Sequence, residues 1–332
     1  MDNQSKAVLY QVIILGAGPA GISAAVEAIK RGIKSNEILI LEKFGEVAHT
    51  IVSKYPNEKA VLANYKNKVA DPSTGLYIND MTKQQFMSFM DETVEKYELK
   101  IEFYQTAEKI TKLKNGQIQV KTSNDSFLGS SLFVAIGTMS APRTLGVSTS
   151  ESISEKIYFD IQAITPAAKR VLIVGGGDSA AEYASILTER GHKVSLSYRG
   201  ASFEKMLDSN NEATMKLIEK GKIEFFASTN IQSIEENNLN PVVHFKEMAN
   251  GHEFDAVVTA LGTERPANYL SSLGIKIINE DDEIFAESSL EGVFYVGDLA
   301  TRRGGSINIA FNSGIKAVAQ ACTNYLDCKS LK

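Results

Sequence analysis

Two glycine-rich segments in matching contexts constrain this chain more than any other feature. The first reads Gly-Ala-Gly-Pro-Ala-Gly at residues 16–21, and the second reads Gly-Gly-Gly-Asp-Ser-Ala at residues 175–180. Each follows an apolar run that is typical of a strand (12–15 and 171–174) and precedes a helix-like run. A strand, a tight glycine turn and a helix form a dinucleotide-binding loop, in which backbone amides at the helix start bind a diphosphate. The sequence therefore predicts two bound dinucleotides, and hydride transfer between them is the simplest chemistry.

The two segments belong to a longer internal repeat. After each one comes an Asn-Gly hairpin signal, at 115–116 and at 250–251. Each hairpin leads to an apolar strand with a nearly identical end, Ala-Ile-Gly-Thr at 135–138 and Ala-Leu-Gly-Thr at 260–263. This matched order predicts two similar nucleotide-binding domains.

Composition limits the classes of function. At 332 residues, with 43% hydrophobic and 23% charged residues, the chain has the length of about two globular domains. A net charge of −5 offers no broad basic field for nucleic acid. No apolar stretch reaches the roughly 18 residues of a membrane span, and residues 1–6 lack the pattern of a signal peptide. We therefore expect a cytoplasmic protein with neither a nucleic-acid nor a membrane partner.

Two cysteines in 332 residues are too few to indicate a framework of disulfide bonds. Cys322 lies on the apolar stripe of the last expected helix. Cys328 follows about 240° further around that helix, so the two thiols could not face each other while the chain stays helical. We expect Cys322 to be a core residue and Cys328 to be an inert thiol in the tail.

The residue after the second strand of each copy indicates which dinucleotide binds. Glu42 ends that strand in the first copy, where an acid accepts hydrogen bonds from ribose hydroxyls and disfavours a 2′-phosphate. This site suits FAD or NAD. The second copy has Tyr198 there, followed by Arg199, which could pair with a 2′-phosphate. NADPH is favoured over NADH, although Gly200 and Glu204 leave only one clear cation.

Other segments add candidate contacts. Gly297-Asp298 follows an apolar strand and could aim a carboxylate at ligand hydroxyls, and the helix that starts near Ser306 could direct its amides at a reduced flavin. The four histidines lack metal-ligand spacing and no G-x-S-x-G occurs, so neither a metal site nor a hydrolase is predicted. Of the histidines, only His49 is a candidate neighbour of the flavin.

With these residues in view, the chain resembles the low-molecular-weight thioredoxin reductase-like flavoproteins. Within that group it looks most similar to the thioredoxin reductase-type ferredoxin/flavodoxin–NADP reductases. The resemblance spans almost the whole chain, and its marks are the two glycine loops, Glu42, the two Ala-x-Gly-Thr strand ends and Val-Gly-Asp at 296–298.

The resemblance implies an α/β fold of two Rossmann-like, three-layer ββα dinucleotide-binding domains, with the NAD(P)H domain inserted in a split FAD domain. The implied boundaries are 1–145 and 265–332 for the FAD domain and 150–262 for the NAD(P)H domain. The implied FAD contacts are Gly16, Gly18, Pro19, Ala20, Gly21, Glu42, Lys43, His49, Thr50, Ala107, Ala135, Gly137, Gly297, Asp298, Ser306 and Ile307. The implied NAD(P)H contacts are Gly175, Gly177, Asp178, Ser179, Ala180, Tyr198, Arg199 and Gly262.

Two departures from the family pattern bear on the reaction. Thioredoxin reductases carry Cys-x-x-Cys shortly before the second glycine loop, whereas residues 158–162 contain no cysteine. Without that dithiol, electrons cannot pass from flavin to thioredoxin by thiol exchange. A related thiol-disulfide reductase group has a cysteine where Ala20 stands. Residues 45–50 replace the Gly-Gly-Gln stretch that contacts flavin in the family.

The sequence thus predicts an oxidoreductase in which NAD(P)H reduces FAD, and FAD reduces an acceptor other than thioredoxin. A ferredoxin, a flavodoxin, a quinone or another small molecule could be that acceptor. A small-disulfide reductase, a flavin monooxygenase-like enzyme and a non-catalytic nucleotide-sensing module are the alternatives. By analogy with the family, the protein is expected to be a homodimer.

Overall fold

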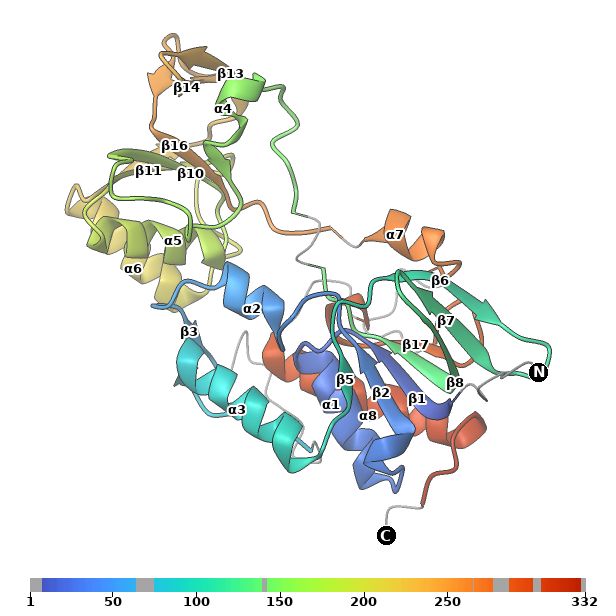
Figure 1. Ribbon diagram of the computed structural model, residues 1–332. Coiled ribbons are helices and arrows are strands. Elements are labelled where there is room, and N and C mark those ends of the chain that lie inside the picture. Colours follow the sequence, from blue (N-terminus) through green and yellow to red (C-terminus); the bar gives the residue numbers. More distant parts are fainter. Residues whose placement is uncertain are drawn as a thin grey trace. The chain divides into compact units, whose positions relative to one another are not determined.

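The computed structural model divides the chain into two units (Figure 1). It describes residues 8–63, 75–138, 142–264, 266–276, 287–300 and 306–329. Unit 1 comprises Met1–Val52, Ala60–Ser140 and Arg265–Lys332, and unit 2 comprises Ser53–Lys59 and Ala141–Glu264. Unit 2 therefore interrupts unit 1 in sequence.

Unit 1 is built on a sheet with strand order β5-β2-β1-β8-β7-β6, in which β17 also pairs with β8. Strands β5, β2, β1, β8 and β17 are parallel, whereas β6, β7 and β8 form an antiparallel meander. The predicted hairpin at Gly116 joins β6 to β7. The apolar runs of β1 and β2 are buried on both faces, as in other central parallel strands. The bounds are β1 Leu9–Leu15, β2 Ile38–Leu41, β5 Ile101–Glu102, β6 Ala107–Lys112, β7 Ile118–Thr122, β8 Ser126–Val134 and β17 Val293–Tyr295.

Two long helices, α1 and α8, pack on each other against one face of this sheet (Figure 1). Their backbones approach closely: the Ser23 hydroxyl donates to the Phe311 carbonyl oxygen at 3.1 Å, and a Cβ on Gly314 would lie 3.1 Å from the Ala24 nitrogen. Glycine at 314 is what permits this contact. The other elements of unit 1 are short or peripheral. The bounds are α1 Pro19–Lys30, η1 Ser35–Glu37, α2 His49–Lys54, β3 Ala60–Val61, β4 Met81–Thr82, α3 Lys83–Lys96, α7 Ala267–Ser272, η2 Gly297–Ala300 and α8 Ile307–Asn324.

Unit 2 repeats the same plan at smaller size. Its sheet has the order β12-β11-β10-β16-β9, with all strands parallel. Helix α5 follows β10 and packs on β10, β11 and α6. The antiparallel strands β13, β14 and β15 form a separate small sheet, and the predicted hairpin at Gly251 precedes β15. The bounds are α4 Glu151–Ser154, β9 Ile157–Tyr158, β10 Arg170–Val174, α5 Asp178–Glu189, β11 Lys193–Tyr198, α6 Asp208–Glu219, β12 Ile223–Ala227, β13 Ile231–Asn237, β14 Asn240–Phe245, β15 His252–Glu253 and β16 Ala256–Thr259.

The stretch 53–59 groups with unit 2, although the sequence analysis placed it in the first domain. Charged contacts account for this grouping. The Arg190 guanidinium donates to both Glu58 oxygens at 2.8 Å, and the Lys59 ammonium lies 2.7 Å from a Glu182 oxygen. The Glu58 carboxyl consequently has a pKa below its usual range, because Arg190 donates to it.

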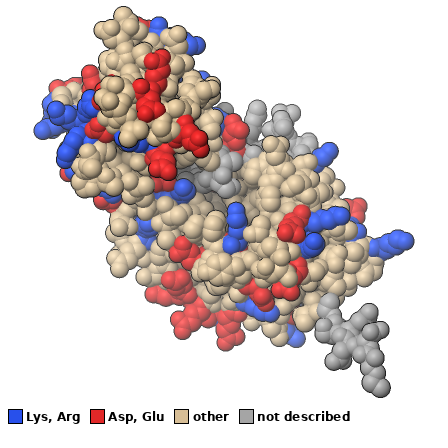
Figure 2. Space-filling view, turned by 45° about the horizontal axis from the view of Figure 1, so that its top comes forward, with Lys and Arg blue, Asp and Glu red and all other residues tan. Residues whose placement is uncertain are grey.

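The surface carries charges of both signs. On the face shown in Figure 2, Lys and Arg side chains lie among Asp and Glu side chains and do not gather into one basic field. No helix in the described part of the chain is both long and apolar enough to cross a bilayer.

Phe294, in β17, allows a prediction about the stability of unit 1. Its side chain is fully buried, and the centroid of its ring lies 5.5 Å from that of Phe133 and 5.8 Å from that of Tyr325. Phe294→Ala should therefore lower the free energy of unfolding by about 3–5 kcal/mol, through lost burial and a cavity. Urea denaturation followed by circular dichroism measures this. The control Leu239→Ala, at an exposed leucine, should change it by no more than about 0.5 kcal/mol. Equal effects of the two substitutions would contradict this packing.

Candidate functional site

The first glycine loop lies between β1 and α1, and two of its glycines have no room for a side chain. Gly16 has φ +105°, and a Cβ there would lie 2.7 Å from the carbonyl oxygen of Ala135. A Cβ on Gly21 would collide with the carbonyl oxygen of Gly16. Backbone bonds fix the strand ends around the loop: Gly16 N donates to Leu41 O and Ala135 N donates to Leu15 O, both at 2.8 Å.

The middle glycine of this loop is different, because it faces open space. Gly18 has φ −78°, which any residue adopts, and a Cβ there would meet nothing within 4 Å. It caps α1 without a side-chain hydrogen bond, and no acidic residue lies in the first turn. The amides at a helix start attract an anion. The loop therefore fits the diphosphate of a dinucleotide, because no protein atom would lie within 4 Å of a Cβ on Gly18, at the start of α1.

The second loop, between β10 and α5, repeats this geometry. Gly175 has φ +151°, and a Cβ there would collide with the carbonyl oxygen of Ala260. Gly177 caps α5 and, like Gly18, would place a Cβ in open space. The equivalent backbone bonds are Gly175 N to Ser197 O at 2.9 Å and Ala260 N to Val174 O at 2.8 Å. The Ala-x-Gly-Thr repeat thus marks the strand whose carbonyl contacts the first glycine of each loop.

Glu42 holds the first loop in place from the end of β2. Its side chain is buried, and its two carboxylate oxygens accept hydrogen bonds from Ala17 N at 2.7 Å and from Phe44 N at 2.9 Å. The carboxylate is therefore fixed beside the loop, and each oxygen has a further lone pair with which to accept a ribose hydroxyl. Phe44 was not predicted, since its contribution is a backbone amide that carries no sequence signal.

The segment after Glu42 returns to the same loop. Ala48 N donates to Ala17 O at 3.1 Å, and α2 begins at the next residue. The His49 ring stacks on Phe44 at 3.6 Å between centroids, and its Nδ1 lies 2.8 Å from Glu46 Oε1. Of the other predicted contacts here, Lys43 and Thr50 are exposed.

The beginning of η2 and the beginning of α8 lie at the first loop. A Cβ on Gly297 would lie 2.8 Å from the Ala20 Cβ, and Gly297 N donates to the Ser313 hydroxyl at 2.6 Å. Asp298 Oδ2 accepts from the Thr138 hydroxyl at 3.5 Å, so the Asp298 carboxylate lies beside the segment that follows β8. The Ser306 hydroxyl caps α8 by accepting from Ile309 N at 3.4 Å, which leaves Ile307 in the first turn. Thr138 was not predicted as a partner of Asp298.

Two further residues of unit 1, Ala107 and Gly137, were predicted to contact FAD. Ala107 begins β6, and its carbonyl oxygen accepts the Tyr269 hydroxyl at 2.7 Å. Gly137 has φ +63° and would place a Cβ in open space, as does Gly262 in unit 2.

In unit 2, the predicted contacts surround the start of α5. The Tyr198 ring lies so close to Gly176 that a Cβ there would collide with it, and Arg199 next to it is exposed. Ser179 is exposed and Ala180 is buried. Asp178 is also buried, and its Oδ1 accepts from Leu207 N at 2.7 Å and from Asn210 Nδ2 at 3.0 Å. These bonds direct the Asp178 carboxylate at the start of α6, so it orders the protein around the loop.

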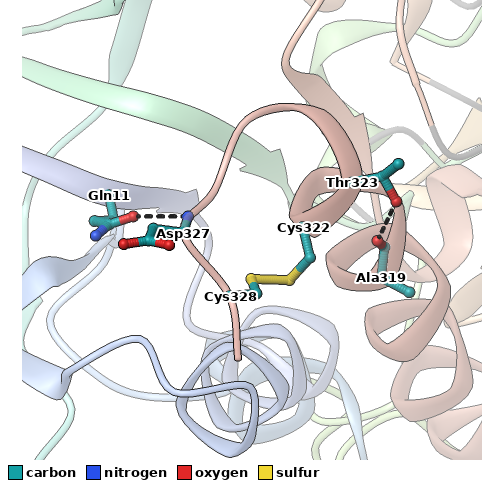
Figure 3. The surroundings of a disulfide bond; sticks show 6 residues. All are labelled: Gln11, Ala319, Cys322, Thr323, Asp327 and Cys328. Carbon is teal, nitrogen blue, oxygen red and sulfur yellow. Dashed lines mark hydrogen bonds between the residues drawn. A yellow bond between two sulfur atoms is a disulfide. The ribbon is translucent and has the colours of Figure 1, made fainter. Parts of the chain in front are cut away.

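The prediction for the two cysteines is wrong. Cys322 and Cys328 form a disulfide with a Cα–Cα distance of 5.4 Å (Figure 3). The helical geometry that kept them apart does not apply, because α8 ends at Asn324 and the chain turns back. Asp327 N then lies 3.5 Å from Gln11 Oε1, and Lys329 N donates to Arg31 O at 2.8 Å.

The disulfide is remote from the glycine loop. Gln11 lies toward the start of β1 and Gly16 follows its end, so at about 3.3 Å per residue the strand separates them by roughly 16 Å. Arg31 follows the other end of α1 from the loop. The Cys322–Cys328 disulfide therefore links the end of α8 to the segment that follows it and does not place a dithiol at the first glycine loop.

The comparisons with known proteins decide the family. The family model described as pyridine nucleotide-disulphide oxidoreductase matches residues 13–297. The chain belongs to this family. The enzyme class expected from the sequence, an FAD-dependent NAD(P)H oxidoreductase, is confirmed, as are its cofactors FAD and a nicotinamide dinucleotide.

The chain is similar in sequence to proteins named ferredoxin–NADP reductase. Ferredoxin–NADP reductase 1 of Bacillus thuringiensis (strain Al Hakam) is 25% identical over 313 residues, covering 89% of this chain and 83% of that protein. Ferredoxin–NADP reductase of Streptococcus pyogenes serotype M5 (strain Manfredo) is 25% identical over 334 residues, covering 96% and 94%.

Among solved structures, bacillithiol disulfide reductase Bdr from Staphylococcus aureus aligns with a TM-score of 0.81 at 21% identity, covering 95% of this chain and 98% of that one. Thioredoxin reductase from T. acidophilum aligns with a TM-score of 0.75 at 21% identity, with the same coverage. These likenesses confirm the predicted α/β fold with two dinucleotide-binding domains.

Gly18 and Gly177, the two glycines that face open space, each allow a prediction of ligand affinity. Gly18→Ala should weaken FAD binding and Gly177→Ala should weaken NADPH binding, because each methyl group enters the space that the diphosphate needs. Overpacking costs about 1–3 kcal/mol, or roughly 5- to 150-fold in affinity. Flavin absorbance and nucleotide titration measure the two effects. Gly177→Ala should retain FAD, and both variants should fold. Unchanged FAD affinity in Gly18→Ala would place the flavin nucleotide elsewhere.

Proposed function

We propose that this oxidoreductase carries electrons from NADPH through FAD to a one-electron protein carrier, a ferredoxin or a flavodoxin. The observation that carries the proposal is the combination of two equivalent glycine loops with the absence of cysteine from the sequence of unit 2 and a disulfide that is remote from the first loop. The only two cysteines of the chain are joined at the far end of β1. With no dithiol beside the cofactors, an acceptor must take electrons from the flavin directly.

For FAD, we assign the diphosphate to the first loop, at Gly16, Gly18, Pro19, Ala20 and Gly21. Support comes from the open space at Gly18 and the amides at the start of α1. Glu42, buried and already holding two backbone amides, would accept the ribose hydroxyls of the adenosine. When bound, FAD supplies the two-electron and one-electron chemistry, so these residues need only hold and orient it.

The flavin end of FAD is assigned to the residues around Asp298. Asp298 would accept a hydroxyl of the ribityl chain, and the first turn of α8 at Ser306 and Ile307 would present backbone amides to the flavin ring. Gly297 brings η2 against Ala20, which supports a continuous path from the diphosphate to this end. We also keep His49 as a neighbour of the flavin, since α2 begins beside the first loop.

For the nicotinamide dinucleotide, we assign the diphosphate to Gly175, Gly177, Ser179 and Ala180, with NADPH favoured over NADH. Arg199 follows the end of β11, is exposed, and stands where an acid would select NADH. Its guanidinium could pair with the 2′-phosphate in two parallel bonds. Tyr198, packed on Gly176, would order the neighbouring backbone.

The named relatives support a protein carrier as the acceptor. Both are called ferredoxin–NADP reductases, and the alignments extend over 83% and 94% of their lengths. A second candidate is the reduction of a small disulfide, which the likeness to bacillithiol disulfide reductase favours. That likeness is below 25% identity, so we rank it second. A cytoplasmic homodimer completes the proposal.

Replacing Arg199 tests the choice of nucleotide. Arg199→Ala should raise the dissociation constant for NADPH by roughly 10- to 150-fold, since a hydrogen bond to a charged group contributes about 1.5–3 kcal/mol. The dissociation constant for NADH should stay the same. Lys193→Ala is the matched control, because Lys193 is an exposed cation at the opposite end of β11. Equal losses for both nucleotides would remove the case for NADPH.

An acceptor panel tests the reaction itself. Protein loaded with FAD is reduced anaerobically by NADPH and then offered oxidised ferredoxin, flavodoxin, a quinone or a small disulfide. We expect the fastest reoxidation with ferredoxin or flavodoxin. Cys322→Ser with Cys328→Ser should leave that rate unchanged, because the disulfide is remote from the cofactor loop. Turnover with small disulfides alone, or its loss in the double variant, would favour the second candidate. Air oxidation through a persistent flavin hydroperoxide would indicate a monooxygenase.

A further inference from the structure

The disulfide of unit 1 joins two residues that are close together in the chain and partly exposed. Cys322 and Cys328 are six positions apart, and solvent reaches part of each residue. A disulfide stabilises a fold mainly by restricting the unfolded chain, and the restriction is smallest when the closed loop is short. This pair therefore adds little stability as a permanent cross-link. Its partial exposure leaves it within reach of an external thiol.

The disulfide holds the C-terminal tail, residues 325–329, beside α1 and β1 (Figure 3). Lys329 N donates to the carbonyl oxygen of Arg31, the C-cap residue of α1, at 2.8 Å. Asp327 N lies 3.5 Å from Gln11 Oε1 near the start of β1. Asp327 and Lys329 are themselves exposed. At this end of the tail, the disulfide is thus the covalent part of an attachment that also uses single hydrogen bonds.

The two sulfur atoms have different electrostatic surroundings. Cys322 lies in the last turn of α8, whose carbonyl end bears a partial negative charge and disfavours a thiolate. Cys328 lies beyond the helix and precedes Lys329, a cation that favours a thiolate. In thiol exchange, the better stabilised thiolate is the better leaving group. An external thiolate is therefore expected to attack Cys322 Sγ, with Cys328 as the leaving group.

We propose that the Cys322–Cys328 disulfide is a reversible redox site, which a dithiol reduces in the folded protein and whose reduction releases the tail from Arg31 and Gln11. One sulfur of the dithiol bonds to Cys322 Sγ while the Sγ–Sγ bond breaks, and Cys328 takes up a proton. The second thiol of the dithiol then displaces Cys322, which is protonated in turn. The dithiol becomes a disulfide, and the protein gains two electrons and two protons.

This redox site is separate from the proposed path of electrons through FAD. It depends on the proposed function only for the cytoplasmic location, where dithiols are available and disulfides in most proteins are transient. Because the two cysteines stay close in sequence after reduction, their effective concentration is high and the disulfide can form again.

Dithiothreitol is the probe for this site. The native protein is treated with dithiothreitol in the absence of denaturant, and its thiols are alkylated and counted by mass spectrometry. We expect both cysteines to be alkylated. Hydrogen exchange at the Lys329 amide should become roughly 2- to 10-fold faster, the factor that the net contribution of one hydrogen bond gives. Removal of dithiothreitol and addition of oxidised glutathione should restore the slow exchange.

Variants and a second thiol sharpen the test. Cys322→Ser with Cys328→Ser should show the fast exchange at Lys329 with and without dithiothreitol. The amide of Phe294, in the buried strand β17, is the control and should exchange at the same rate in every form. The monothiol 2-mercaptoethanol, followed by acid quenching, should leave its mixed disulfide on Cys322.

Three outcomes would overturn the proposal. They are a disulfide that resists dithiothreitol in the folded protein, an unchanged exchange rate at Lys329 after reduction, and faster exchange at Phe294 to the same extent. A mixed disulfide on Cys328 would contradict the order of bond breaking. No measurement here requires NADPH or an electron acceptor, so these failures are distinct from a failure of the proposed electron transfer.

Discussion

Both halves of this protein depend on a close contact between a glycine and the carbonyl of the neighbouring strand. Gly16 lies against Ala135 O, and Gly175 lies against Ala260 O, each with a positive φ. A side chain at either position would separate the central strand from its parallel partner and displace the helix that follows. Because the contact fixes the turn, the glycine two residues further along, Gly18 or Gly177, is left facing open space at the start of a helix. The open helix start that we propose as the phosphate site is therefore a consequence of strand pairing.

The two sites differ in how their polar groups are held. In unit 1, Glu42 is buried and bonded to two amides, and Asp298 is bonded to Thr138. In unit 2, the candidate group for the nucleotide is the exposed Arg199, whereas Asp178 is used to order α6. Groups fixed before binding favour tight retention, because little entropy is lost when the ligand arrives. If the proposed assignments hold, we expect the ligand of unit 1 to be held more tightly than that of unit 2.

Sequence patterns predicted the local features well and the non-local ones poorly. The glycine spacing located both loops, and the Asn-Gly pairs located two hairpins, because these depend on a few adjacent residues. The cysteines were misjudged, since their pairing depends on where α8 ends and on what the tail contacts. Asp178 is predicted as a nucleotide contact from its place in the loop, and the structure adds that its Oδ1 accepts from Leu207 and Asn210, which are 29 and 32 residues away and were not foreseen. The contacts of the site residues with their ligands remain predictions.

The sequence alone determined that the chain has two glycine loops in matching contexts, that an acid follows the second strand of the first copy, and that no Cys-x-x-Cys precedes the second loop. Those conclusions need only glycine positions, one carboxylate and the order of residues. The tertiary structure decided that Ala135 and Ala260 face the loops, that Cys322 pairs with Cys328, and that Lys329 bonds to Arg31. Each of these depends on segments that are distant in the chain, and only folding brings such segments within bonding distance.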